Sequence, residues 1–258
     1  MAFILLWLVC AAPVHAAVSS AQLDGVRIDA KPNASIPMSL SFVDENGTPR
    51  TLADAMHGTP AVLVFADYTC TNLCGPILAF AAAGLEKSGL MPGKDFHFVV
   101  VGLDPKDGAK DARAMKSSRI GARTSLADAT EMLIGKPEVI AVATQAAGYH
   151  YVYDAEHDQF AHPAAAYVLT KDGQIVRVLS GLGLSGGDLR LALVDAGQGR
   201  IGSLLDQVKL RCFGFDAAKG IYTATISRWL TIAGTATAIA LAGAIACMAF
   251  ARGRRAPT

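Results

Sequence analysis

Apolar runs alternate with helix-like segments along the middle of the chain, and this pattern predicts an α/β fold. The runs at 61–66 and 96–103 contain few polar side chains, which is typical of strands buried on both faces of a parallel sheet. The segment 77–87 between them is rich in Ala and Leu and predicts a helix, and 107–117 predicts another. A β–α–β unit with a right-handed crossover is therefore expected.

The second half of the domain is expected to contribute further strands and a last helix. Alternating or apolar segments predict strands at 39–43, 149–153, 166–169 and 174–179, and an amphipathic pattern predicts a helix at 188–196. The strands at 166–169 and 174–179 are joined by Lys171-Asp172-Gly173, which predicts a hairpin. The region 120–147 is alanine-rich and shows no clear periodicity.

The N-terminal residues resemble an export signal. An apolar stretch from Phe3 to Ala12 precedes Val14-His15-Ala16, so residues 1–16 are predicted to be a secretory signal peptide. About ten apolar residues are too few to cross a bilayer, which needs ~20. Residues 17–37 are polar and are expected to form a linker, and the folded domain is expected to span 38–200.

The C-terminal residues predict a membrane anchor. Residues 201–228 are expected to form a juxtamembrane segment, and 229–251 carry no charge over a length that fits a transmembrane helix. Residues 252–258 contain three arginines, so the positive-inside rule places this tail in the cytoplasm and the domain outside. A signal peptide would place the domain on the same side.

Composition excludes some functions and draws attention to the cysteines. The formal net charge of +1 over 258 residues gives no electrostatic case for binding nucleic acid. Cys10 would be lost with the signal peptide, and Cys247 lies in the predicted membrane span. Three exported cysteines do not make a disulfide scaffold, so each is expected to have a task.

Two of those cysteines follow the strand 61–66 directly. Cys70 and Cys74 lie at a strand-to-helix turn, where the helix N-terminus stabilises a thiolate. Residues i and i+4 share one helix face, so both sulfurs can point at one small object. That object could be a soft metal ion, or the partner of each sulfur could be the other.

The remaining candidate ligands favour copper over other metals and over other site types. Structural zinc needs four ligands, and a second Cys or His pair is missing. His162 lies in a loop directly before the strand 166–169, where a sheet can deliver its side chain to the cysteine turn. Two thiolates and one imidazole suit copper. The glycines at 181–186 match a dinucleotide-binding pattern, but no further strand follows, so a flexible loop is expected.

Three motifs in this order resemble the Sco/SenC family of thioredoxin-like copper proteins, over about residues 38–200. They are Phe65-Ala66-Asp67-Tyr68-Thr69-Cys70 with Cys74 four positions on, Val101-Gly102-Leu103-Asp104-Pro105, and Phe160-Ala161-His162 before Tyr167-Val168-Leu169. The stretch Cys212-Phe213-Gly214-Phe215-Asp216 is similar to a branch with a C-terminal membrane anchor.

The resemblance implies a thioredoxin-like fold, with a central mixed sheet flanked by helices, and copper, as Cu(I) or Cu(II), bound by Cys70, Cys74 and His162. It further implies delivery of that copper to the binuclear centre of cytochrome c oxidase, or to another periplasmic copper protein. The expected location is a bacterial-type inner membrane with the domain in the periplasm. An Asp common in the family is replaced here by Ala161, which is expected to weaken Cu(II) binding more than Cu(I) binding.

The chain departs from the family pattern at three other positions. Leu73 precedes the second cysteine where Asp is common, Gly75 separates that cysteine from Pro76, and Gly214 replaces a His.

Two alternatives stay open. A periplasmic thiol–disulfide oxidoreductase would use the same fold and the same Cys70 and Cys74, but would not require His162. A membrane-tethered assembly module would need no chemistry at all. Cys212 is interpreted either as an accessory thiol that hands copper or electrons to a membrane partner, or as a buried structural residue.

Overall fold

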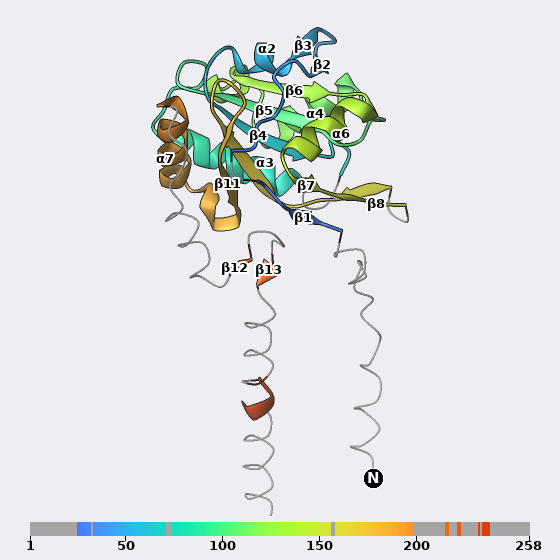
Figure 1. Cartoon of the computed structure of the whole chain (residues 1–258), viewed down its shortest axis with the longest axis vertical. Helices are drawn as coiled ribbons and strands as arrows, with labels where there is room; N and C mark the ends of the chain where they lie inside the picture. The colour runs from blue at the N-terminus through green and yellow to red at the C-terminus, as the bar shows by residue number, and fades with distance from the viewer. Residues whose placement is uncertain are drawn as a thin grey trace, which may run out of the picture.

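The computed structural model describes residues 25–31, 33–70, 74–155, 158–198, 215–216, 221–222, 232 and 234–237. Its centre is a seven-stranded sheet with the order β11-β10-β4-β5-β6-β2-β3 (Figure 1). The strands are β2 (Ser41–Asp44), β3 (Pro49–Thr51), β4 (Ala61–Ala66), β5 (His97–Gly102), β6 (Thr130–Ile134), β10 (Ala165–Leu169) and β11 (Ile175–Ser180).

The sheet is mixed. The neighbours β4, β5 and β6 run parallel, while β10 and β2 pair antiparallel with the two outer members of this trio. The helices are α2 (Leu52–Met56), α3 (Cys74–Lys87), α4 (Ala109–Arg119), α5 (Ser125–Asp128), α6 (Pro137–Ala146) and α7 (Gly186–Gly197), with a 3-10 turn η2 (Gly181–Leu184) before the last.

Three short strand pairs complete the described structure. They are β1 (Arg27–Ile28) with β7 (Tyr149–His150), β8 (Val152–Asp154) with β9 (Gln159–Ala161), and β12 (Phe215–Asp216) with β13 (Ile221–Tyr222).

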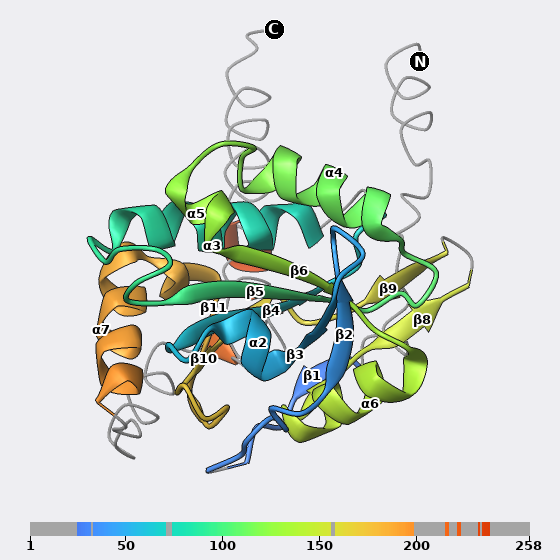
Figure 2. The ribbon, with the colours of Figure 1, turned by 90° about the horizontal axis from the view of Figure 1, so that it is seen from above.

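Helices cover both faces of the sheet, which explains why its central strands β4 and β5 are almost entirely apolar. All six residues of β4 are buried, and because side chains alternate along a strand they feed two cores. Val62 and Val64 pack with α3, α4, α5 and α7, while Leu63 and Phe65 pack with α2 and α6. Figure 2 shows α3, α4 and α5 on one side of the sheet and α2 and α6 on the other.

The predicted α/β class with a central mixed sheet is confirmed, and so are most of the predicted elements, including the hairpin of β10 and β11. The region 120–147, which gave no prediction, contains β6 and the helices α5 and α6. Pro137 begins α6, where proline's missing N–H costs nothing. The strand expected at 149–153 is wrong as a single element, because β7 and β8 belong to different sheets.

The folded unit includes residues before position 38, where the domain was expected to begin. Ile28 pairs with Tyr149, Ser35 bridges to Gln174, and the Ile36 side chain is fully buried. These contacts tie part of the expected linker to the domain.

The predicted signal peptide at 1–16 lies outside the described residues, as does most of the predicted juxtamembrane segment and anchor. Of 229–251 the structure describes only Ile232 and 234–237, which are helical. Within the described part of the chain, no helix combines the length and the apolar character needed to cross a membrane.

Candidate metal centre

The pairing of β4 with β10 brings two distant segments together. The strands run antiparallel with Val64 opposite Ala166, so residues just after β4 and just before β10 meet at one edge of the sheet. Cys70 follows β4, and His162 precedes β10. The sheet thus brings the His162 segment to the cysteine turn, by the route that the sequence suggested.

Asp67 holds these two segments against each other. Its side chain is fully buried. One carboxylate oxygen accepts hydrogen bonds from the N–H and the hydroxyl of Thr69, at 3.0 and 3.1 Å, and the other accepts from the N–H of Phe160 at 3.1 Å. The first contact is an Asx-type turn, which shapes the chain just before Cys70.

Tyr68 anchors the cysteine turn to the sheet. Its hydroxyl lies 3.0 Å from the carbonyl of Val100 and 2.9 Å from that of Leu133, and burial raises the pKa of Tyr68 well above its usual value. A Cβ at Gly102 would come within 2.9 Å of the Tyr68 ring. Glycine at 102 is therefore what allows this ring to lie across the end of β5.

Asp107, in the loop after β5, fixes the same turn from the other side. Its carboxylate accepts a hydrogen bond from the N–H of Tyr68 at 2.7 Å. Burial is the main cause that raises the pKa of Asp107 to about 6, and the nearby carboxylates of Asp67 and Asp104 contribute smaller increases to that value. Three buried carboxylates make this edge of the sheet a negative environment, which favours a cation over an anion.

Cys70 is 7% exposed and lies outside α3. Its thiol donates a hydrogen bond to Oε1 of Gln159 at 3.7 Å. Cys74 is the first residue of α3, where the positive end of the helix favours a thiolate. The expectation that both cysteines share one helix face is therefore wrong: one lies in the turn and the other at the helix N-terminus.

The structure describes the backbone of Cys74 but not its side chain. Among the side chains that it does describe, no group of three His, Cys, Asp or Glu residues is arranged to hold a metal ion. The ligand set of Cys70, Cys74 and His162 therefore stays a prediction.

His162 is half-buried beside Tyr149. Its Nδ1 lies 2.7 Å from the Tyr149 hydroxyl oxygen and 3.1 Å from the carbonyl oxygen of Pro163. Burial lowers the pKa of His162 below its usual value, against smaller opposing effects of Pro163 and Asp67. The imidazole is therefore neutral at neutral pH, which is the form that binds metals.

Other candidate residues lie elsewhere. His97 begins β5 and stacks on His57, with 4.6 Å between ring centroids, at the opposite end of the parallel strands. Cys212 lies outside the described residues. The glycines 181–184 form η2 after β11, an antiparallel strand at the edge of the sheet, so the described fold has no dinucleotide-binding unit there.

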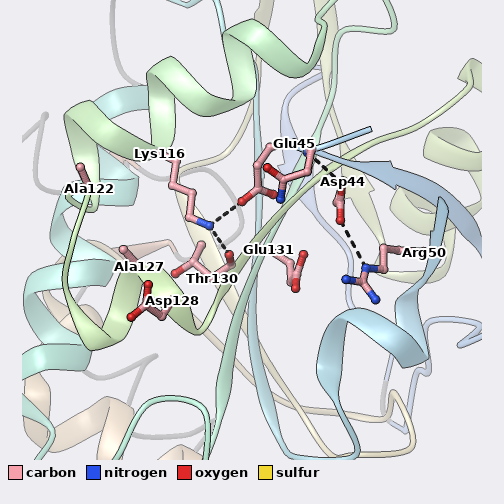
Figure 3. A pocket seen from close by; sticks show the side chains of 10 residues that line it. Asp44, Glu45, Arg50, Lys116, Ala122, Ala127, Asp128, Thr130 and Glu131 are labelled. Atoms are coloured by element: carbon pink, nitrogen blue, oxygen red, sulfur yellow. Dashed lines mark hydrogen bonds and ion pairs between the residues drawn. The ribbon is translucent and has the colours of Figure 1, made fainter. Parts of the chain in front are cut away.

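A pocket of about 270 Å³ lies at the junction of β2, β6 and α4 (Figure 3). Its lining contains no Cys or His. Lys116 crosses it to reach Glu45 Oε1 at 2.5 Å and the carbonyl of Thr130 at 2.6 Å, and the other oxygen of Glu45 accepts from the N–H of Met132 at 3.0 Å. These contacts tie α4 to the sheet edge, and the pocket is not a soft-metal site.

Comparison with known proteins agrees with this architecture. The fold, with its central mixed sheet between helices, is that of thioredoxin-like Sco structures. The SCO1/SenC family model matches residues 28–185, and the chain belongs to this family. A comparison with curated proteins finds no significant match.

Several solved structures share the fold. A protein from Aquifex aeolicus VF5 has a TM-score of 0.57 at 20% identity, covering 66% of this chain and 96% of its own. Arabidopsis thaliana ScoI, solved with copper bound, has a TM-score of 0.52 at 17% identity, covering 64% and 99%. BsSco is described as a Sco-family cytochrome c oxidase assembly protein with a disulfide switch. It has a TM-score of 0.52 at 18% identity, covering 66% and 98%.

Proposed function

We propose that this chain is a membrane-tethered copper chaperone. Its cargo is one copper ion, held by Cys70, Cys74 and His162 and delivered to the binuclear copper centre of cytochrome c oxidase. The observation that carries the proposal is the antiparallel pairing of β10 with β4, which sets the His162 segment against the turn that contains Cys70.

The residues at this edge of the sheet fit copper. Two thiolates are soft ligands that favour Cu(I), and one imidazole makes Cu(II) acceptable as well. Membership of the SCO1/SenC family supports this metal, as does the copper bound to the similar Arabidopsis protein. Ala161 stands where the family commonly has Asp, which accords with weaker binding of Cu(II) than of Cu(I).

The site also suits a carrier rather than a permanent holder of copper. Its proposed ligands come from a turn, a helix N-terminus and a loop at the edge of the sheet, and not from the strands themselves. A three-ligand copper site at such an edge leaves room for thiolates or imidazoles of a recipient protein to replace its ligands one by one.

We further propose the topology that the sequence indicates. Residues 1–16 direct export, 229–251 span a bacterial-type inner membrane, and 252–258 remain in the cytoplasm, so that the domain faces the periplasm. The basis is the uncharged span followed by Arg252, Arg254 and Arg255. The recipient is then the periplasmic copper-bearing subunit of the oxidase, or another periplasmic copper protein.

A thiol–disulfide oxidoreductase is the second candidate. The position of Cys74 at the N-terminus of α3 favours a reactive thiolate, and the similar BsSco is described as having a disulfide switch. The two functions are compatible, because copper loading requires both thiols to be reduced.

Titration of the reduced full chain with Cu(I) and Cu(II) against a competing chelator separates the two. Cys70→Ser and Cys74→Ser should each abolish Cu(I) retention, since water cannot replace a soft donor. His162→Ala should weaken Cu(II) much more than Cu(I), because two thiolates alone satisfy only Cu(I). His150→Ala is the matched control, because this half-exposed imidazole contacts Asp29, 3.3 Å away. The His150→Ala variant should bind copper as the wild type does.

The outcome against the chaperone proposal is equally clear. If the wild-type chain retains neither Cu(I) nor Cu(II), and the wild type and His162→Ala reduce a partner disulfide at the same rate, the protein is an oxidoreductase.

A further inference from the structure

The hydrogen bonds around His162 determine which ring nitrogen carries its proton. The Tyr149 hydroxyl lies 2.8 Å from the carbonyl oxygen of Pro163, which can only accept, so the hydroxyl hydrogen points there. The same hydroxyl oxygen lies 2.7 Å from Nδ1 of His162 and must then accept from it. Nδ1 also lies 3.1 Å from the Pro163 carbonyl, a second acceptor. Both neighbours require a proton on Nδ1.

A neutral imidazole carries only one N–H, so its lone pair then lies on Nε2. We propose that Tyr149 is a positioning residue whose hydroxyl fixes His162 in the Nδ1–H tautomer and thereby presents Nε2 as the copper-binding atom. The proposal deepens the proposed function and, in its copper part, rests on it.

The fold holds Tyr149 firmly enough for this task. Its side chain is 3% exposed. Its ring packs on Phe65 and Tyr167, with centroids 4.7 and 6.2 Å away. On the backbone, Tyr149 pairs with Ile28 of β1. Contacts with β4, β10 and β1 therefore fix the Tyr149 hydroxyl, and its hydrogen bond in turn orients the imidazole of His162.

The arrangement gives a physical account of Ala161. A metal-binding histidine usually donates its second N–H to a carboxylate, a carbonyl or water, which orients the ring and raises its basicity. Here Ala161, and not a carboxylate, directly precedes His162, and the Tyr149 hydroxyl and the Pro163 carbonyl together supply the acceptors. A phenol is a weaker acceptor than a carboxylate, which agrees with reduced support for Cu(II).

The test uses Tyr149→Phe in the full-length chain, which removes one oxygen and retains the ring that packs on Phe65. Tyr151→Phe is the matched control, because Tyr151 is a half-buried tyrosine two residues away whose hydroxyl lies near Thr144. The first readout is the pair of ¹⁵N ring shifts of His162 in the reduced, metal-free protein, assigned by their loss in His162→Ala. The wild type and Tyr151→Phe should show protonated Nδ1 and unprotonated Nε2. Tyr149→Phe should shift both signals toward a mixture of tautomers.

The second readout is Cu(II) affinity, which Tyr149→Phe should lower about 10- to 100-fold, the usual effect of losing such a partner. Tyr151→Phe should leave the affinity unchanged. Unprotonated Nδ1 in the wild type, or identical shifts and affinities in Tyr149→Phe, would overturn the role of Tyr149 while leaving copper binding intact. A wild-type chain that binds no copper would instead overturn the proposed function, and the ring shifts would still decide the tautomer.

Discussion

Asp107 should make the stability of the domain depend on pH in a way that one substitution removes. Burial raises its pKa from 3.8 to about 6, so the folded state holds this proton more tightly than the unfolded state. The free energy of unfolding therefore falls as pH rises from about 4 through 6, because the folded state must then bury a charge. The sign is opposite to that of a carboxylate stabilised by an ion pair.

The size of the effect follows from the two pKa values. With 3.8 in the unfolded state and about 6 in the folded state, ionisation costs about 1.6 kcal/mol of stability at pH 5 and about 3 kcal/mol at pH 8. Asp107→Asn cannot ionise, yet its amide oxygen can still accept from the N–H of Tyr68. The stability of the variant relative to wild type should therefore rise by about 1.4 kcal/mol between pH 5 and pH 8.

Urea unfolding of the full chain, followed by far-UV circular dichroism at pH 5, 6, 7 and 8, measures this difference. Asp172→Asn is the control, since that carboxylate lies 74% exposed in the turn between β10 and β11. A stability difference for Asp107→Asn that stays constant over this range, or that falls with pH, would contradict a raised pKa of Asp107 in the folded state. It would mean that Asp107 is charged in the folded state at little cost.

Three further predictions concern the ion pair of Lys116 with Glu45, the orientation of the chain in the membrane, and Cys212. Lys116→Met should destabilise the domain by about 3–5 kcal/mol in urea unfolding, because it leaves Glu45 charged and buried; a loss below about 1 kcal/mol would show that water solvates this pocket. A reporter active only in the cytoplasm should function when fused after Thr258 and fail when fused near Gly199, and the reverse pattern would contradict the orientation. If Cys212 is an accessory thiol, Cys212→Ala should reduce copper loading of the oxidase in cells, and unchanged loading and thiol reactivity would exclude that role.

The central strands were predictable because burial on both faces leaves a simple signature. β4 is a continuous apolar run and β5 is one after its first residue, His97, and the sequence located both within one or two residues. The strand β6 escaped notice because the polar pair Thr130 and Glu131 at its start leaves only three apolar residues in a row. The burial of Ile36, within the expected linker 17–37, was not predicted for a related reason: a single buried side chain in a polar segment leaves no periodic pattern.

In the candidate site, the proposed ligands could be predicted from local sequence, whereas the residues that support them could not. Cys70, Cys74 and His162 were recognisable because each lies in a short motif beside a predicted element. Their supporting residues were not, because the contacts are made across the fold. Gln159 meets Cys70 from 89 positions away, and Asp107 meets Tyr68 from 39. Gln159 meets Cys70 because β10 pairs with β4, and Asp107 meets Tyr68 because β5 lies beside β4.

X-ray absorption at the copper edge identifies the types of ligand around the metal and so tests whether Cys70, Cys74 and His162 bind copper. The measurement uses the reduced full chain loaded with one equivalent of Cu(I). Two sulfur ligands and one imidazole nitrogen are expected in the wild type, and two sulfurs without the nitrogen in His162→Ala. A spectrum with only nitrogen and oxygen ligands, or one that His162→Ala leaves unchanged, would contradict this ligand set.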